Sequence, residues 1–280
     1  MAIVNDEALL RTLVRSLSPV PGVEAIVLGG SRARGTATGS SDYDIGLYYR
    51  AAQPIDIAAL QEVVSNLDDR GAAAEVTPIG GWGPWIDGGG WLLIKGAPVD
   101  LLYRNIDRVG AAIDAAHAGK VERTYQPGHP HAFLPMIYMG EVAYSRVLHD
   151  PNGVVAALHA RTKPYPHALA RALRTCFEWE AEFALANARK SLDRHDVSYL
   201  AGCAFRAVAC LCQTLFALNG IYLLNEKGAV AAVGTFARKP ANFTQRVTDL
   251  FADLGSGAHA SGLDRLETLI ADSRSLWEER

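Results

Sequence analysis

Three acidic residues in the first half of the chain have the types and the spacing that phosphate chemistry requires. Asp42 and Asp44 are separated by one residue at the start of a predicted strand, residues 43–49. Because side chains two residues apart in a strand point to the same face, we expect both carboxylates on one face. Two carboxylates at this range disfavour each other's ionised form unless a cation lies between them. The pair predicts a divalent-cation site, and Mg2+ fits because it binds a few carboxylates, waters and phosphate oxygens.

A third acid, Asp100, lies in the apolar run 99–103, where an isolated carboxylate would be unfavourable. If this strand lies beside the strand 43–49, the three carboxylates converge, and Asp100 is positioned to accept a proton from a hydroxyl group. The structural alternative is a partly exposed acid on an edge strand. Glu141 is a second candidate for the proton acceptor, although an exposed helix glutamate is the simpler interpretation.

A glycine-rich turn precedes the acid pair. The apolar run 24–28 ends in a Gly-Gly-Ser turn that contains Gly30 and Ser31, and such a turn exposes backbone N–H groups and a hydroxyl to the phosphates of a nucleotide. Gly30 and Gly35 have the glycine spacing of a P-loop, but Thr36 occupies the position where a P-loop has lysine. The P-loop hypothesis therefore fails, and the acids explain this stretch better.

Together, these motifs resemble a known family. The Gly30-Ser31 turn, the Asp42-Tyr43-Asp44 triplet and the later strand with Asp100 resemble the nucleotidyltransferase domain of the DNA polymerase β-like superfamily. A small catalytic domain followed by a helical bundle is similar to bacterial minimal, aminoglycoside and lincosamide nucleotidyltransferases. The motif resemblance covers roughly residues 24 to 103, whereas the second half of the chain is similar in character only.

The resemblance implies a reaction and a set of residue roles. The reaction is the transfer of a nucleoside monophosphate from a nucleoside triphosphate such as ATP to a hydroxyl group, with pyrophosphate as the leaving group. By position, Ser31 would hold the triphosphate, next to Gly30. Asp42, Asp44 and Asp100 would be the catalytic acids and would ligate Mg2+, as two ions.

Three cationic residues are further candidates for nucleotide binding. Arg32 and Arg34 flank the turn and could neutralise the leaving pyrophosphate, although an exposed turn arginine is commonly just solvated. Lys227 belongs to the polar loop 225–228 of the predicted helical region and could clamp phosphate. A lysine that complements a helix dipole is the simpler alternative for Lys227.

The elements that position these residues follow from hydrophobic periodicity. The first half reads as a mixed α/β domain, residues 1–125, built on a small sheet with flanking helices. Its predicted helices and strands are the helix 9–17, the strands 24–28 and 43–49, the helix 56–67, a β-prone stretch 74–79, and the strands 91–95 and 99–103, which a turn at 96–98 separates.

The β signal stops beyond residues 126–135, and the second half, residues 126–280, reads as an all-α bundle. Two long apolar stripes need helical partners, which two further helices supply. The fold class is therefore α+β. The predicted helices contain residues 169–188, 200–218, 244–254 and 263–279.

Three smaller features have structural interpretations as well as functional ones. The Gly-rich stretch 80–90 with Trp82, Trp85 and Trp91 could stack a nucleobase, but a loop folded over its own tryptophans is favoured. The four cysteines show no zinc-binding spacing and are expected to be reduced core thiols. His129 and His131 lack metal-binding partners at a recognisable spacing.

Composition and charge narrow the function classes. The chain has 280 residues, with 27 Lys and Arg against 30 Asp and Glu, so its net charge of −3 argues against binding to long nucleic acids. The uncharged segment 207–225 is interpreted as the central helix of a soluble bundle and not as a membrane span. With no secretory signal at the N-terminus, we expect a cytoplasmic protein, and the sequence permits a homodimer.

The sequence thus predicts a Mg2+-dependent nucleotidyltransferase that acts on a small hydroxylated acceptor. An aminoglycoside-like or lincosamide-like molecule fits this class. Two alternatives stay open: an AMPylating enzyme of the toxin-antitoxin type that modifies protein side chains, and a non-catalytic nucleotide-binding module. The general base is either Asp100 or Glu141.

Overall fold

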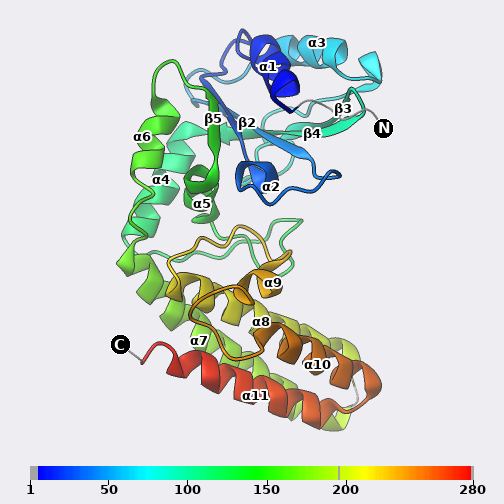
Figure 1. The fold of residues 1–280 in the computed structure, drawn as a ribbon, viewed down its shortest axis with the longest axis vertical. Helices are drawn as coiled ribbons and strands as arrows, with labels where there is room; N and C mark the ends of the chain where they lie inside the picture. Colours follow the sequence, from blue (N-terminus) through cyan, green and yellow to red (C-terminus); the bar gives the residue numbers. More distant parts are fainter. Residues whose placement is uncertain (1–5, 195, 279–280) are drawn as a thin grey trace. The chain divides into compact units, whose positions relative to one another are not determined.

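The computed structural model describes residues 6–194 and 196–278, which form two compact units (Figure 1). Unit 1 contains the described residues up to Asp114 together with Tyr138–Pro164, and unit 2 contains Ala115–Ile137 and the described residues from Tyr165 onward. The chain therefore passes between the units three times. The sequence analysis placed a single boundary at residue 125. Hydrophobic periodicity does not reveal that the later segment Tyr138–Pro164 belongs to unit 1.

Unit 1 is built on a five-stranded mixed sheet with the order β3-β4-β2-β1-β5. The central strands β2 and β4 are parallel, and every other neighbouring pair is antiparallel. This arrangement, with the helices described below, confirms the predicted α+β class. The strands are β1 (Ala25–Leu28), β2 (Tyr43–Tyr49), β3 (Gly89–Ile94), β4 (Ala97–Asn105) and β5 (Arg146–His149).

The two faces of the sheet have different chemistry. One face buries alternate residues of the central strands, such as Ile45 and Leu101, against helices α1 (Asp6–Leu17) and α3 (Ile57–Leu67). Figure 1 shows both helices on that side. The opposite face carries Asp44 and Asp100, because side chains alternate along a strand. The apolar core on one face thus fixes which way the acids point.

Several elements differ from the sequence prediction. β5 was missed because a four-residue edge strand is too short to show a period, and the helices α4 (Ile106–His117), α5 (Ile137–Tyr144) and α6 (Val154–Ala160) were also missed. The stretch 74–79 is not a strand of the sheet. Its backbone is held by single contacts instead: Val76 N–H donates to Gln61 Oε1 at 3.0 Å, and Thr77 N–H donates to the Gly89 carbonyl at 2.8 Å.

Unit 2 is helical, as the sequence predicted for its longest segments. α8 is long and apolar enough to cross a membrane by composition, and 72% of its most apolar stretch is buried. That burial is typical of the central helix of a bundle, the reading that the sequence favoured. The helices are α7 (His167–Lys190), α8 (Val197–Leu218), α9 (Ala229–Val233), α10 (Phe243–Ser256) and α11 (His259–Ser275).

Candidate active site

The structure brings the three predicted acids together. Asp44 on β2 and Asp100 on β4 are partners in the register of these parallel strands, so their side chains lie next to each other on one face. Asp42 is exposed and precedes β2 by one residue, whereas Asp44 and Asp100 are partly buried. The condition set by the sequence, that strand 99–103 lies beside strand 43–49, is therefore met.

The acids interact electrostatically, and little positive charge compensates them. Burial raises the pKa of Asp100 to about 6, and the negative charges of Asp42 and Asp44 add to the shift. Burial also raises the pKa of Asp44, as do Asp42 and Glu141, while Arg34 and Arg104 oppose the increase without cancelling it. A cluster of this kind is stabilised by an added cation.

The Gly-Gly-Ser turn lies directly against this cluster. Gly29 N–H donates to the Asp44 carbonyl at 2.7 Å, which ties the turn after β1 to β2. Gly30 begins the short helix α2 (Gly30–Ala33) with a φ of +60°, and a Cβ atom at this position would lie 1.7 Å from Asp44 Oδ2. Position 30 therefore requires glycine for its backbone conformation and for its contact with the carboxylate.

Arg32 holds the backbone of the site instead of pointing freely to a ligand. Its Nη2 donates to the Ser41 carbonyl at 2.7 Å, and its Nε lies 3.2 Å from the Asp42 carbonyl. Its Nη1 pairs with Asp6 at 3.1 Å, and its guanidinium group lies 3.7 Å above the ring of Tyr43. The side chain of Arg32 is only 13% exposed. It holds the backbone segment that leads into Asp42, a role that the sequence alone did not indicate.

The other predicted cations have simpler surroundings. Arg34 Nε donates to the Gly30 carbonyl at 3.2 Å, and its charge lowers the pKa of Asp44, so Arg34 belongs electrostatically to the site. Lys227 is exposed in unit 2, and its backbone N–H donates to Asn225 Oδ1 at 2.8 Å. Its role in nucleotide binding stays a prediction.

Glu141 differs from the exposed helix glutamate that the sequence suggested. It lies on α5 in unit 1 and accepts two hydrogen bonds from the buried Arg104, Nε to Oε2 at 2.7 Å and Nη2 to Oε1 at 2.8 Å. The side chain of Arg104 is only 5% exposed. Arg104 follows Asp100 by four residues, so both side chains lie on the same face of β4. An arginine on the face that carries the acids was the sequence signal that the analysis missed.

The tryptophan loop follows its structural reading. Trp82 stacks on Trp91 with ring centroids 4.5 Å apart, as expected of a loop anchored on its own tryptophans. The buried Asp87 anchors the loop further, because it accepts a hydrogen bond from the Tyr49 hydroxyl at 3.0 Å and forms an ion pair with Arg108. These contacts tie the stretch 80–90 to β2, β3 and α4.

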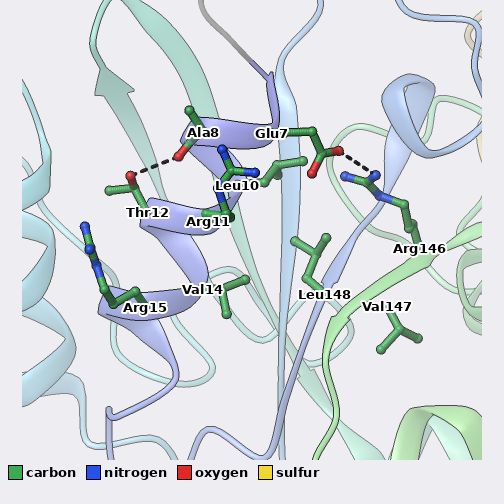
Figure 2. Close-up of a pocket in the computed structure, with 10 residues that line it drawn as sticks. All are labelled: Glu7, Ala8, Leu10, Arg11, Thr12, Val14, Arg15, Arg146, Val147 and Leu148. Atoms are coloured by element: carbon green, nitrogen blue, oxygen red, sulfur yellow. Dashed lines mark hydrogen bonds and ion pairs between the residues drawn. The ribbon is translucent and has the colours of Figure 1, made fainter.

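A groove of about 660 Å3 in unit 1 lies away from the acids, between α1 and β5 (Figure 2). Arg11 and Arg15 of α1 line it, and Glu7 pairs with Arg146 of β5 at 2.9 Å. No sequence-predicted site residue is among its lining residues. Since α1 covers the apolar face of the sheet, this groove is not the place where the acids would meet a substrate.

Unit 2 contains a second set of metal-ligand residue types. His131, Glu180 and Cys210 place one potential ligand atom each within 4.8 Å of the others. However, Glu180 already pairs with Arg206, at 2.6 Å, and with Arg123. Burial raises the pKa of the Cys210 thiol, which keeps it neutral, and the two guanidinium groups repel a cation. A cation therefore meets less positive charge at the acids of unit 1 than at this cluster.

Comparison with known proteins addresses the two parts of the chain separately. Residues 8–82 match the family described as nucleotidyltransferase domain, and residues 134–227 match a domain family of unknown function, DUF4037. The first match contains Gly30, Ser31, Asp42 and Asp44, and confirms the nucleotidyltransferase resemblance. Asp100 lies beyond its end.

Relatives of the whole chain are remote. None of the curated proteins matches this sequence. A solved structure of a nucleotidyltransferase-like protein from Exiguobacterium sibiricum 255-15 is similar over 98% of this chain and 78% of its own, with 11% identity and a TM-score of 0.44. The assignment rests on the family match to residues 8–82, because this structural likeness is too distant to carry it.

Proposed function

We propose that this chain, which carries a nucleotidyltransferase domain, moves a nucleoside monophosphate from a nucleoside triphosphate such as ATP to a hydroxyl group of a small acceptor. One observation supports the proposal above the others. Asp44 and Asp100 are register partners on parallel strands, and the Gly30 turn lies against the Asp44 carboxylate. A turn able to hold phosphates and a set of acids able to hold cations thus share one end of the sheet.

The residues fit a divalent cation. Asp42, Asp44 and Asp100 would hold Mg2+, because they are hard oxygen ligands and because burial, together with the neighbouring acids, raises the pKa of Asp44 and Asp100. When bound, the metal supplies neutralising charge for the phosphate groups. Among the described residues, neither Asp44 nor Asp100 forms an ion pair with a cationic side chain that could take that place.

The remaining roles belong to the chain's own groups. N–H groups of the turn and the Ser31 hydroxyl would hold the triphosphate, while Arg34 adds positive charge beside them. The acceptor oxygen forms a bond to the α-phosphorus, the bond to pyrophosphate breaks, and the hydroxyl proton passes to a carboxylate. Asp100 suits that step because it lies beside Asp44 on the same face of the sheet, where the acceptor hydroxyl would meet the phosphates.

Glu141 is the weaker candidate for the base. Both of its carboxylate oxygens accept hydrogen bonds from the buried guanidinium of Arg104, so the side chain is already held by another group of the chain. We therefore assign proton acceptance to Asp100 and assign Glu141 to positioning Arg104. The net charge of −3 further supports a small acceptor over a polynucleotide.

A pyrophosphate-release screen tests the proposal. The full chain is incubated with Mg2+, each of the four ribonucleoside triphosphates and a panel of hydroxylated small molecules, and tagged ATP is added in parallel to a whole proteome. We expect acceptor-dependent release of pyrophosphate with at least one small molecule. Labelling of proteins alone would instead support an AMPylating enzyme. No transfer in either arm, although nucleotide binds, would contradict the proposal in favour of a non-catalytic module.

A further inference from the structure

A groove of about 640 Å3 between α7 and α8 in unit 2 is separate from the acids and unused by the proposed reaction. Its walls include three exposed aromatic side chains: Trp179 is 61% exposed, Phe183 52% and Tyr199 47%. The rings of Trp179 and Phe183 stack with an interplanar angle of 11°, so they form one flat wall. Aromatic surface gathered in one groove is a mark of a binding site.

The groove also contains a glycine that the fold does not require. Gly202 lies in the interior of α8 and is exposed, and a Cβ atom built there would have no neighbour within 4 Å. A glycine inside a helix destabilises it by about 0.5–1 kcal/mol relative to alanine. No described part of the chain packs closely on Gly202, so the space above it is open to a bound group.

The groove is also lined by two basic residues that share one partner. Arg123 and Arg206 line it, with 38% and 53% of their side chains exposed, and both pair with the buried Glu180. Two guanidinium groups against one carboxylate leave a net positive charge. Each guanidinium has five N–H donors, so the pairing with Glu180 fixes the orientation of both arginines and still leaves donors for another anion.

We propose that this groove binds a small ligand that combines a flat aromatic ring with an anionic group such as a carboxylate, phosphate or sulfonate. The ring lies over Gly202 against the wall of Trp179 and Phe183, and the anion lies at Arg123 and Arg206. The volume is in the range of about 300–1,000 Å3 found for small-molecule sites. The inference is independent of the nucleotidyl transfer proposed for unit 1.

Fluorescence titration of the full chain with 8-anilinonaphthalene-1-sulfonate, an aromatic anion, tests this site. N-phenyl-1-naphthylamine has the same ring system without the sulfonate, and inorganic sulfate has the charge without the ring. We expect saturable binding of the sulfonated probe, at least tenfold weaker binding of the neutral probe, and no competition by sulfate at the same concentration. Equal affinity for the charged and neutral probes would overturn the role of the arginines.

Variants locate the binding in the groove. Gly202→Leu should fill the open space and reduce the affinity for both probes at least tenfold, whereas Arg206→Gln should weaken the sulfonated probe alone. Gly255→Leu is the matched control, because Gly255 is an equally open, exposed glycine on α10. Far-ultraviolet circular dichroism checks that each variant is folded. Unchanged binding in a folded Gly202→Leu protein, or equal losses in the Gly255→Leu protein, would overturn the proposal.

Discussion

Asp44 and Asp100 in unit 1 and Glu180 in unit 2 are carboxylates with opposite surroundings. In unit 1, burial and neighbouring acids raise the pKa of Asp44 and Asp100. In unit 2, burial alone would raise the pKa of Glu180, but a hydrogen bond with His131 and the charges of Arg206 and Arg123 outweigh it and lower the pKa to about 2. Glu180 is nevertheless the most deeply buried of the three.

The difference separates a carboxylate that is paired with arginines of the chain from carboxylates that repel each other. The chain itself supplies the partners of Glu180, so its charge contributes to the stability of unit 2. The repulsion between Asp44 and Asp100 remains in the folded chain and opposes folding, which is expected where a bound cation completes a site. His131, Glu180 and Cys210 also have residue types that bind metals, but the two arginines paired with Glu180 disfavour a cation there.

Asp44→Asn should have the largest effect and acts on activity. Loss of this ligand should lower the turnover of nucleotidyl transfer at least about a thousandfold, equivalent to about 4 kcal/mol of transition-state stabilisation, while the protein stays folded. Pyrophosphate release with Mg2+ measures the effect. Asp114→Asn, which removes an exposed acid of α4 paired with Arg161, is the control and should keep its turnover. Near-normal turnover in Asp44→Asn would contradict the site.

Gly30→Ala should be nearly as damaging, because the added methyl group would lie 1.7 Å from Asp44 Oδ2 and must displace that carboxylate. We expect a loss of turnover of about a hundredfold, or about 2.7 kcal/mol. Gly35→Ala is the matched control. Its φ of +70° imposes similar backbone strain, but no atom lies within 4 Å of the new Cβ. Equal losses in both variants would show that strain, and not the contact with Asp44, causes the effect.

Glu180→Gln should lower the free energy of unfolding by about 2 kcal/mol at pH 7, because two arginines lose their buried partner. The lowered pKa means that Glu180 stabilises the native state above about pH 4.5, and that this stabilisation is lost as the pH falls towards 2. Urea denaturation at several pH values measures both effects. The control is Glu182→Gln on α7, which breaks an exposed pair with Arg274 of α11 and should change stability by less than about 0.5 kcal/mol.

Asp100→Asn should shift stability in the opposite direction. Its native pKa of about 6 exceeds the ordinary value of 3.8, so the protonated form favours the native state below about pH 4, and this advantage is lost as the pH rises through 6. The substitution should therefore stabilise the metal-free protein at pH 7.5 by about 1 kcal/mol, after allowance for solvent screening. Urea denaturation in EDTA should show this gain. A destabilised variant at pH 7.5 would contradict the repulsion.

Local sequence patterns predicted the parts of this site that depend on neighbouring residues. The strand 43–49 and the alternation that places Asp42 and Asp44 on one face follow from a period of two. The sequence could place Asp100 near the acid pair only if the strand 99–103 lies beside the strand 43–49. The order of strands in a sheet cannot be read from the residues of either strand. In the structure, the register of β2 and β4 meets that condition.

Long-range contacts account for what the sequence did not reveal. Arg104 and Glu141 are 37 positions apart, and Arg32 reaches Asp6 across 26, so no periodicity connects the partners. The hairpin between β3 and β4 turns at Lys95 and Gly96, both with positive φ, one residue earlier than the turn expected at 96–98. The conformation of this turn depends on the register between β3 and β4, and residue-by-residue turn propensities carry no information about register.

The threefold passage of the chain between the units has a consequence for limited proteolysis and for expression of fragments. A piece that ends at residue 125 contains Asp42, Asp44 and Asp100 but lacks β5 and α5. Without β5, one edge of β1 loses its hydrogen-bonding partner, and exposed edges of this kind promote association between copies. Without Glu141, the buried guanidinium of Arg104 loses its counter-ion. Unit 1 is therefore made of two separate chain segments. We expect a fragment that ends at residue 125 to be insoluble.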